Sequence, residues 1–229
     1  MALYAYKKKT ISKSAIVLNK ISRISIIFGL ILMFWAFYPV ISFEIYSKFF
    51  IKNQAKISDT DSNKLQDLTK ASLWFPSVNS QVISQNINVK EYSLTIPKLN
   101  IENAKVIVGG EDLKKSLIQF VPTSLPGENG NVVILGHSTL PQLYNIKDYK
   151  TIFTYLPSLK EGDKIETKLG DQVFEYEVFD ITVVKPSEVS VLKQDFSNSY
   201  LTLITCVPPG TYWNRLIVKA RIVDTLELF

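Results

Sequence analysis

One long apolar run stands out near the start of the chain. Residues 24–43, ISIIFGLILMFWAFYPVISF, hold no charged side chain over 20 positions, which is the length a helix needs to cross the hydrocarbon core of a bilayer. Trp35 and Tyr38 lie in its C-terminal half and Tyr46 follows shortly after it, where interfacial aromatic residues are expected. We therefore predict a membrane-spanning helix. A cleaved signal peptide is the alternative, but no small-x-small cleavage site follows the run.

The pattern changes to short β-type runs from Tyr92 onward. Segments such as NVVILG, QVFEYEVFDITVV, SYLTLITC and RLIVKARIV are rich in β-branched and aromatic residues, and several alternate apolar with polar positions. The Gly170-Asp171 pair between two runs predicts a hairpin. Short helices are expected at residues 111–119, 149–156 and 187–192. Many closely spaced strands predict a mainly all-β domain, either a closed barrel or a sandwich.

The charge distribution favours a membrane protein over a nucleic-acid binder. The net charge is +5, from 26 basic and 21 acidic residues, and six of the basic residues lie in residues 1–23, which hold no acid. Subtracting these six leaves 20 cations against 21 acids in the rest. The positive-inside rule then places the tail in the cytoplasm and the following domain outside.

We divide the chain into four parts on this basis. Residues 1–23 form a basic cytoplasmic tail, residues 24–43 the transmembrane anchor, residues 44–90 a polar linker or stalk, and residues 91–229 the catalytic domain. Within the linker, residues 71–76 (ASLWFP) form an apolar patch that could dock on the domain.

The chain has a single cysteine and a single histidine. This pair makes a poor metal site and leaves no internal disulfide. Cys206 ends the run LTLITC and precedes Val-Pro-Pro-Gly, so a strand would deliver its thiol to the rim of a sheet. A buried cysteine packing as a small hydrophobe is the alternative, although exported chains seldom carry an unpaired thiol without a use.

Two further side chains could serve that thiol. His137 also follows a β run, VVILG, and a cysteine needs a neighbouring base or cation to become a nucleophile. Arg215 opens the final β run, with eight residues, 207–214, between it and Cys206. A hairpin could return its guanidinium to the thiol, where it could bind a developing oxyanion. Either residue could instead be an ordinary solvated side chain in a loop or on a sheet edge.

The motif TLITCVPPGTYWNRLIV, residues 202–218, resembles the signature of the sortase family: T-L-x-T-C, a Pro/Gly turn, then an arginine that opens the next strand. Residues 94–99 (LTIPKL) resemble the strand that opens the sortase domain, and residues 125–138 resemble the family segment that leads to the catalytic histidine. The short spacing from Cys206 to Arg215 is similar to classes C, D and E, of which D or E fits best. Ser138 stands where many members have arginine, and residues 140–148 form a longer stretch than usual.

The resemblance implies an eight-stranded β-barrel and cleavage of an LPxTG-like sorting motif. It implies that Cys206 forms a thioester, that His137 transfers protons, that Arg215 stabilises the oxyanion and that Thr205 contacts the substrate backbone. The partners would be sorting-signal proteins, the membrane, and an amine acceptor on peptidoglycan or a pilin-like protein, with no cofactor, metal or nucleic acid. Two alternatives are a hydrolytic cysteine protease and an inactive wall-binding β module.

Overall fold

The computed structural model describes residues 13–53, 69–75, 89–121 and 123–227. One α-helix, nine strands and five 3-10 turns (η) make up these ranges. In chain order they are α1 (Lys13–Phe50), β1 (Lys52–Asn53), η1 (Ala71–Leu73), β2 (Glu91–Ile96), η2 (Pro97–Leu99), β3 (Ile101–Val108), β4 (Leu117–Gln119), β5 (Gly130–Leu135), η3 (Pro141–Leu143), η4 (Leu156–Ser158), β6 (Lys164–Leu169), β7 (Gln172–Val184), η5 (Val189–Leu192), β8 (Ser199–Val207) and β9 (Asn214–Glu227).

Eight strands close into a barrel. Their order is β7-β6-β2-β3-β4-β5-β8-β9, and β9 pairs back onto β7 along nearly its whole length. The short β1 pairs in parallel with Thr182 and Val183 of β7, beyond the part of β7 that pairs with β6. The prediction of a closed eight-stranded barrel is confirmed, and the sandwich alternative is wrong. Because a closed sheet pairs every strand on both sides, it exposes few unpaired backbone groups.

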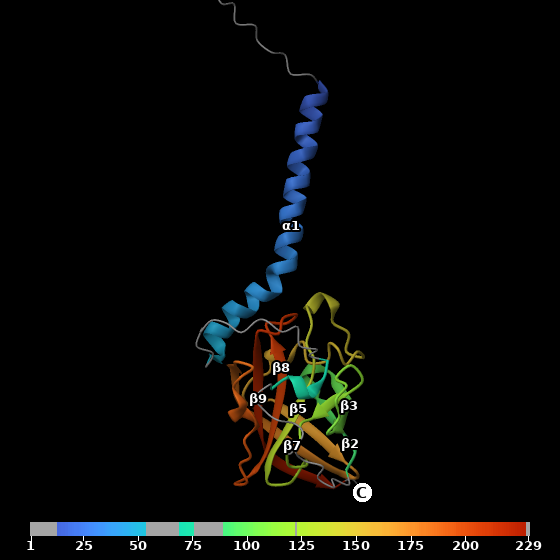
Figure 1. Ribbon diagram of the computed structural model, residues 1–229, viewed down its shortest axis with the longest axis vertical. Coiled ribbons are helices and arrows are strands. Elements are labelled where there is room, and N and C mark those ends of the chain that lie inside the picture. Colours follow the sequence, from blue (N-terminus) through green and yellow to red (C-terminus); the bar gives the residue numbers. More distant parts are fainter. Residues whose placement is uncertain (1–12, 54–68, 76–88, 122, 228–229) are drawn as a thin grey trace, which may run out of the picture.

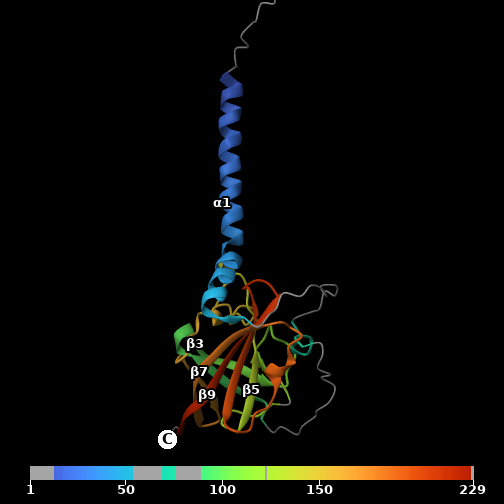
Figure 2. The same ribbon diagram turned by 90° about the vertical axis from the view of Figure 1, so that its left-hand side faces the viewer.

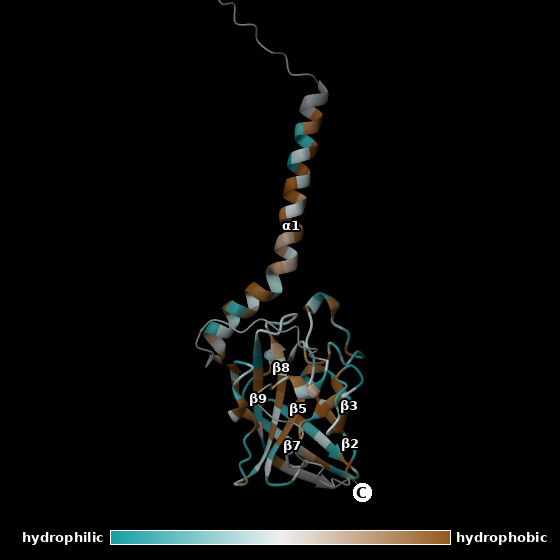
Figure 3. Ribbon diagram, in the orientation of Figure 1, coloured by the Kyte–Doolittle hydropathy of each residue, from teal (hydrophilic) through white to brown (hydrophobic). Residues whose placement is uncertain are grey.

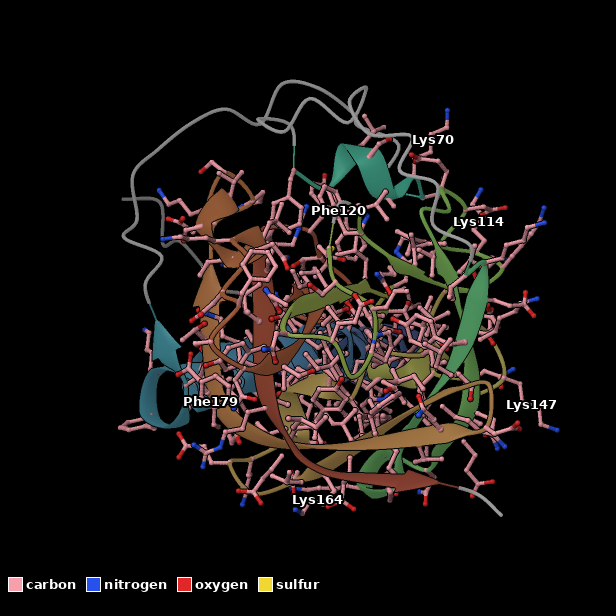
Figure 4. All side chains as sticks on the ribbon, turned by 90° about the horizontal axis from the view of Figure 1, so that it is seen from below. Lys70, Lys114, Phe120, Lys147, Lys164 and Phe179 are labelled. Carbon is pink, nitrogen blue, oxygen red and sulfur yellow. The ribbon has the colours of Figure 1, made fainter. Side chains whose placement is uncertain are left out.

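The alternation of apolar and polar residues along the strands separates the inner face of the barrel from its outer face. In β2, Tyr92, Leu94 and Ile96 are buried while the residues between them are more exposed, and alternating brown and teal along the strands is visible in Figure 3. The inner side chains form one large apolar cluster that contains Leu94, Val132, Tyr176, Leu201 and Val218 among others. Figure 4, viewed along the barrel from below, shows these side chains filling the interior, while Lys147 and Lys164 point outward.

A second apolar cluster lies on the outer face of one wall of the barrel. It joins Leu135 of β5, Ile204 of β8 and Ile217 of β9 to residues from outside the barrel, including Trp74 and Phe75. Residues 69–75, which we call the cover segment, lie over this wall; they are drawn in teal in Figure 1, and in Figure 4 they sit above Phe120. The predicted docking of residues 71–76 is thus confirmed for residues 71–75; residue 76 lies outside the described ranges.

The helix α1 has two parts with different surroundings. From residue 17 to residue 38 every side chain is exposed, and this apolar stretch projects away from the barrel (Figures 1 and 2). From Pro39 onward, one side of the helix is buried at intervals of four residues, at Pro39, Phe43, Ser47 and Ile51. A four-residue spacing keeps these side chains on one helix face, and Phe43 and Ile51 join the inner core cluster. The helix bends where Pro39 interrupts its hydrogen bonds.

The short predicted elements had mixed outcomes. The Gly170-Asp171 hairpin is confirmed, since Leu169 of β6 faces Gln172 of β7 and Gly170 has φ +60°. The helix expected at residues 111–119 is wrong. Its last three residues form β4, because Ile118 and Gln119 pair with β5 on one side and β3 on the other. Residues 187–192 do contain a helical turn, η5. The four-part division of the chain remains a prediction, although α1 runs past residue 43 to Phe50.

Candidate active site

Cys206 and Arg215 are direct cross-strand neighbours. β8 and β9 form an antiparallel hairpin in which the two residues face each other in register. Opposed residues in such a pair place their side chains on the same face of the sheet. The alternation along the strands makes this the outer face, because Ile204 and Ile217, two residues away in each strand, belong to the outer cluster together with Cys206.

His137 lies at the end of the strand next to β8. β5 runs parallel to β8, with Leu135 paired to Ile204. His137 and Cys206 each lie two residues beyond this pair, so the register brings them alongside each other at the same end of the barrel. The backbones stay close past the end of β5, since the Ser138 hydroxyl donates to the carbonyl oxygen of Cys206 at 2.6 Å. All three residues therefore meet on one face, which the sequence alone could only suggest.

Gly136 explains how this end of β5 is fixed. A β-carbon at this position would come within 2.4 Å of the Phe153 ring and 2.6 Å of Leu117, so only glycine allows the strand to approach them. Its carbonyl oxygen accepts a hydrogen bond from the Thr205 hydroxyl at 2.8 Å. The two strands that carry His137 and Cys206 are thus tied together one residue before the functional side chains.

Thr205 itself points into the barrel. It is fully buried, on the opposite side of β8 from Cys206. Its hydroxyl is engaged with Gly136 rather than directed to the outer face. Contact between Thr205 and a substrate backbone remains a prediction, while the hydrogen bond favours a positioning role.

The guanidinium of Arg215 is buried without a carboxylate partner among the described residues. The residue is 2% exposed. Nη1 donates to the carbonyl oxygens of Tyr212 and Asn214 at 3.1 and 3.3 Å, and Nη2 to that of Trp74 at 3.5 Å. Its Nε has no hydrogen-bond partner in the described part of the chain. A buried cation with an unused N–H is a ready donor for a developing negative charge.

Two features around the Cys206 thiol shift its pKa in opposite directions. Cys206 is 6% exposed, and its burial raises the pKa of the thiol, because the charged thiolate loses its hydration. The nearby Arg215 guanidinium acts the other way and lowers that pKa. Burial is the larger effect, so the thiol keeps its proton more tightly than an ordinary cysteine does.

Trp74 of the cover segment contacts both Arg215 and His137. Its ring centroid lies 5.2 Å from Cζ of Arg215, within the range of a cation–π contact, and 5.7 Å from the centroid of the His137 ring. Trp74 is fully buried. Sequence reasoning did not assign Trp74 to the site; the only signal was the apolar patch within a polar linker.

Backbone and side-chain hydrogen bonds hold the cover segment in place. Ala71 N donates to Glu111 O at 3.0 Å, and Leu113 N donates to Thr69 O at 3.1 Å. The Glu111 carboxylate also accepts from the backbone and the hydroxyl of Ser72, at 3.2 and 2.9 Å. The segment is therefore fixed to the residues before β4, with Trp74 beside the Arg215 guanidinium and the His137 ring.

Comparisons with known proteins agree with this arrangement. A family model described as a sortase domain matches residues 94–223, more than half of the chain. The chain belongs to the sortase family. It is accordingly a cysteine transpeptidase, and its long apolar helix fits a membrane-anchored protein.

Similar sortases come from several branches of the family. Sortase A of Bacillus anthracis is 26% identical over 165 residues, which cover 72% of this chain and 71% of that protein. Sortase D of Bacillus subtilis is 28% identical over 117 residues, 50% of this chain and 53% of that one. The structure of sortase C-1 from Actinomyces oris matches with a TM-score of 0.52 and 32% identity, over 58% of this chain and 73% of that one. A sortase D5 transpeptidase from Clostridium perfringens matches with a TM-score of 0.51 and 28% identity, over 59% and 79% of the two chains.

Proposed function

We propose that this sortase acts outside the membrane, with Cys206 as nucleophile, His137 as proton carrier and Arg215 as oxyanion donor. Its substrates are proteins with an LPxTG-like sorting signal, and its acceptor is an amine on the cell wall or on a pilin-like protein. One observation carries the assignment: Cys206 faces Arg215 across the β8–β9 hairpin, and His137 lies two residues past the end of the adjacent strand β5, at the same level.

The first half of the reaction forms a thioester. The thiol passes its proton to the His137 imidazole, and the Cys206 sulfur attacks the carbonyl carbon of the scissile peptide bond. Negative charge then develops on the carbonyl oxygen, where the Arg215 guanidinium stabilises it. As the C–N bond breaks, His137 returns the proton to the leaving amine, and the acyl group remains on sulfur.

The second half transfers the acyl group to the new amine. The incoming amine attacks the thioester carbon and gives a proton to His137, a second oxyanion forms at the same donor, and the C–S bond breaks. The proton then returns to the sulfur. Covalent catalysis divides one difficult amide exchange into two easier steps, and every proton is accounted for by the imidazole and the thiol.

The cover segment sets a condition on the first step. Because Cys206 and Arg215 are 6% and 2% exposed, a peptide carbonyl reaches them only when Trp74 leaves its position over Arg215. We therefore place displacement of residues 69–75 before thioester formation.

Mass spectrometry of the acyl-enzyme tests the proposal. The full chain in detergent micelles is incubated with LPxTG-like peptides and either triglycine or a diamine. We expect a mass increase on Cys206 that disappears as the amide product forms, and no adduct or product from Cys206→Ala. His137→Ala should form product at a rate lower by at least about a hundredfold, the range for lost proton transfer.

Each outcome has a distinct meaning when thermal unfolding shows the variants to be folded. A thioester that only hydrolyses would favour a cysteine protease acting through the same residues. Normal turnover by Cys206→Ala or His137→Ala would contradict the role of that residue.

A further inference from the structure

The part of α1 long enough to span a membrane overlaps the part that packs on the barrel. A helix needs about 20 residues to cross the hydrocarbon core. Counted from Ile24, which follows Arg23, these residues end at Phe43. The helix already packs on the barrel from Pro39 onward. The end of the barrel that meets α1 therefore shares its depth with the last turn of the membrane span.

A hydrogen bond between the barrel and α1 fixes which loop lies at that depth. The side-chain amide of Gln142 donates to the backbone carbonyl of Trp35 at 3.1 Å. Trp35 lies one turn before Pro39, within the fully exposed apolar part of α1. The loop that carries η3 thus reaches the level of an interfacial tryptophan inside the span. Figure 1 shows this loop rising beside the helix, from the end of the barrel to which β8 points.

A second loop joins the first at the same end. Gly210, in the turn between β8 and β9, packs directly on Leu140, since a β-carbon there would lie 2.6 Å from Leu140 Cδ2. The tip of this turn holds Tyr212 and Trp213, which are 64% and 58% exposed, while Leu143 in the first loop is 65% exposed. The two loops therefore present large apolar side chains on one continuous surface.

The composition of these loops suits a lipid interface. Residues 138–146 and 207–214 contain no charged side chain, whereas most exposed loops of soluble domains are charged or polar. Uncharged loops with exposed tryptophan, tyrosine and leucine are the kind of surface that partitions into the boundary between headgroups and acyl chains.

We propose that the loops of residues 138–146 and 207–214 form a membrane-contact surface that inserts Leu143 and Trp213 into the bilayer interface beside α1. The occupant of this surface is the membrane that α1 crosses. The same two loops follow His137 and Cys206 in the chain, so the contact holds the active-site end of the barrel against the membrane. Substrates and acceptors that are themselves membrane-attached would then meet the site at the bilayer surface.

Depth measurements with spin labels test this proposal on the full chain. Cys206 is the only cysteine, so a Cys206→Ala background permits single labels at Leu143→Cys and Trp213→Cys. Phe196→Cys is a matched control: Phe196 is 67% exposed, but it precedes β8 and lies at the opposite end of the barrel. Each labelled protein is reconstituted in phosphatidylcholine–phosphatidylglycerol vesicles, and collisions with oxygen and with a water-soluble nickel chelate are compared.

The expected result is a clear separation between the two ends. Labels at positions 143 and 213 should collide several-fold more with oxygen, relative to the nickel chelate, than the label at position 196, because oxygen concentrates in lipid. The same ratio at position 143 or at position 213 as at position 196 would overturn the proposal. All three sites are exposed, so labelling leaves the core unchanged, and thermal unfolding of each labelled protein verifies this.

Discussion

At the scale of single residues, the central feature is a buried cation that faces a buried thiol. Arg215 holds its position through backbone carbonyls on three residues, and its Nε is unused in the described structure. This places a fixed donor next to the sulfur, on a rigid hairpin. A planar guanidinium can offer two parallel N–H groups to an oxygen, which the ammonium of lysine cannot reproduce.

Arg215→Lys should therefore lower kcat/KM for a sorting peptide by at least about a hundredfold, the usual cost of losing an oxyanion donor. Arg221→Lys is the control, since Arg221 is exposed on the same strand and should keep its rate. Steady-state kinetics of both variants decide the matter. Comparable rates for the two variants would reduce Arg215 to a structural role.

The protonation state of Cys206 gives a second test at this scale. Burial raises the pKa of the thiol more than Arg215 lowers it, and the thiolate is the reactive form. The rate of alkylation by iodoacetamide should thus rise with pH to a plateau. The midpoint of this rise should lie at a higher pH than the midpoint for the same thiol in the urea-unfolded chain. Access to the buried site changes the size of the rate but not its midpoint. A midpoint at or below that of the unfolded chain would contradict this balance of effects.

At the scale of elements, the cover segment links the linker to the site. It is a single helical turn, η1, followed by two fully buried aromatic side chains. Its hydrogen bonds go to residues 111–113, the start of the stretch for which the sequence predicts a helix. That stretch forms a bridge to the cover segment at Asp112, then a turn closed by Lys115 N donating to Asp112 O, and then β4, so no helix forms there.

Trp74→Ala should increase the rate of Cys206 alkylation by about tenfold or more at fixed pH. Burial of a large side chain contributes about 1.5–3 kcal/mol, and each 1.4 kcal/mol corresponds to a factor of ten in the population of the open form. Lys70→Ala, at an exposed position of the same segment, is the control and should react like the unmodified chain. Equal rates for all three proteins would show that Trp74 does not limit access to the thiol.

At the scale of the whole molecule, the helix α1 is packed against the barrel. The lower part of α1 contributes Phe43 to the core, and β1 follows immediately and pairs with β7 near the active-site end. The anchor therefore joins the barrel without a free hinge between them in the described ranges. The barrel therefore keeps one position relative to α1.

The orientation across the membrane is a separate prediction. The basic residues before the span favour a cytoplasmic N-terminus and an external domain. In the Cys206→Ala background, an impermeant thiol reagent should label Phe196→Cys in intact cells, and Lys8→Cys only after permeabilisation. The reverse pattern would place the catalytic domain in the cytoplasm and exclude a role at the cell wall.

The sequence by itself determined the features that depend on local pattern or on a short motif. It predicted the apolar span, the β-rich domain, the hairpin at Gly170-Asp171, and Cys206, His137 and Arg215 as the candidate site residues. Periodicity and turn residues are local, and a hairpin fixes the register of neighbouring strands, so these conclusions needed no distant contact.

Only the tertiary structure decided what depends on residues far apart in the chain. The parallel pairing of β5 with β8 brings His137 to Cys206, although 68 residues separate them. Trp74 reaches Arg215 across 141 positions, and Gln142 reaches Trp35 across 107. Closure of the barrel, the position of the cover segment and the packing of α1 on the barrel all follow from such contacts. They lie beyond any local pattern, because their energy comes from surfaces that meet only after folding.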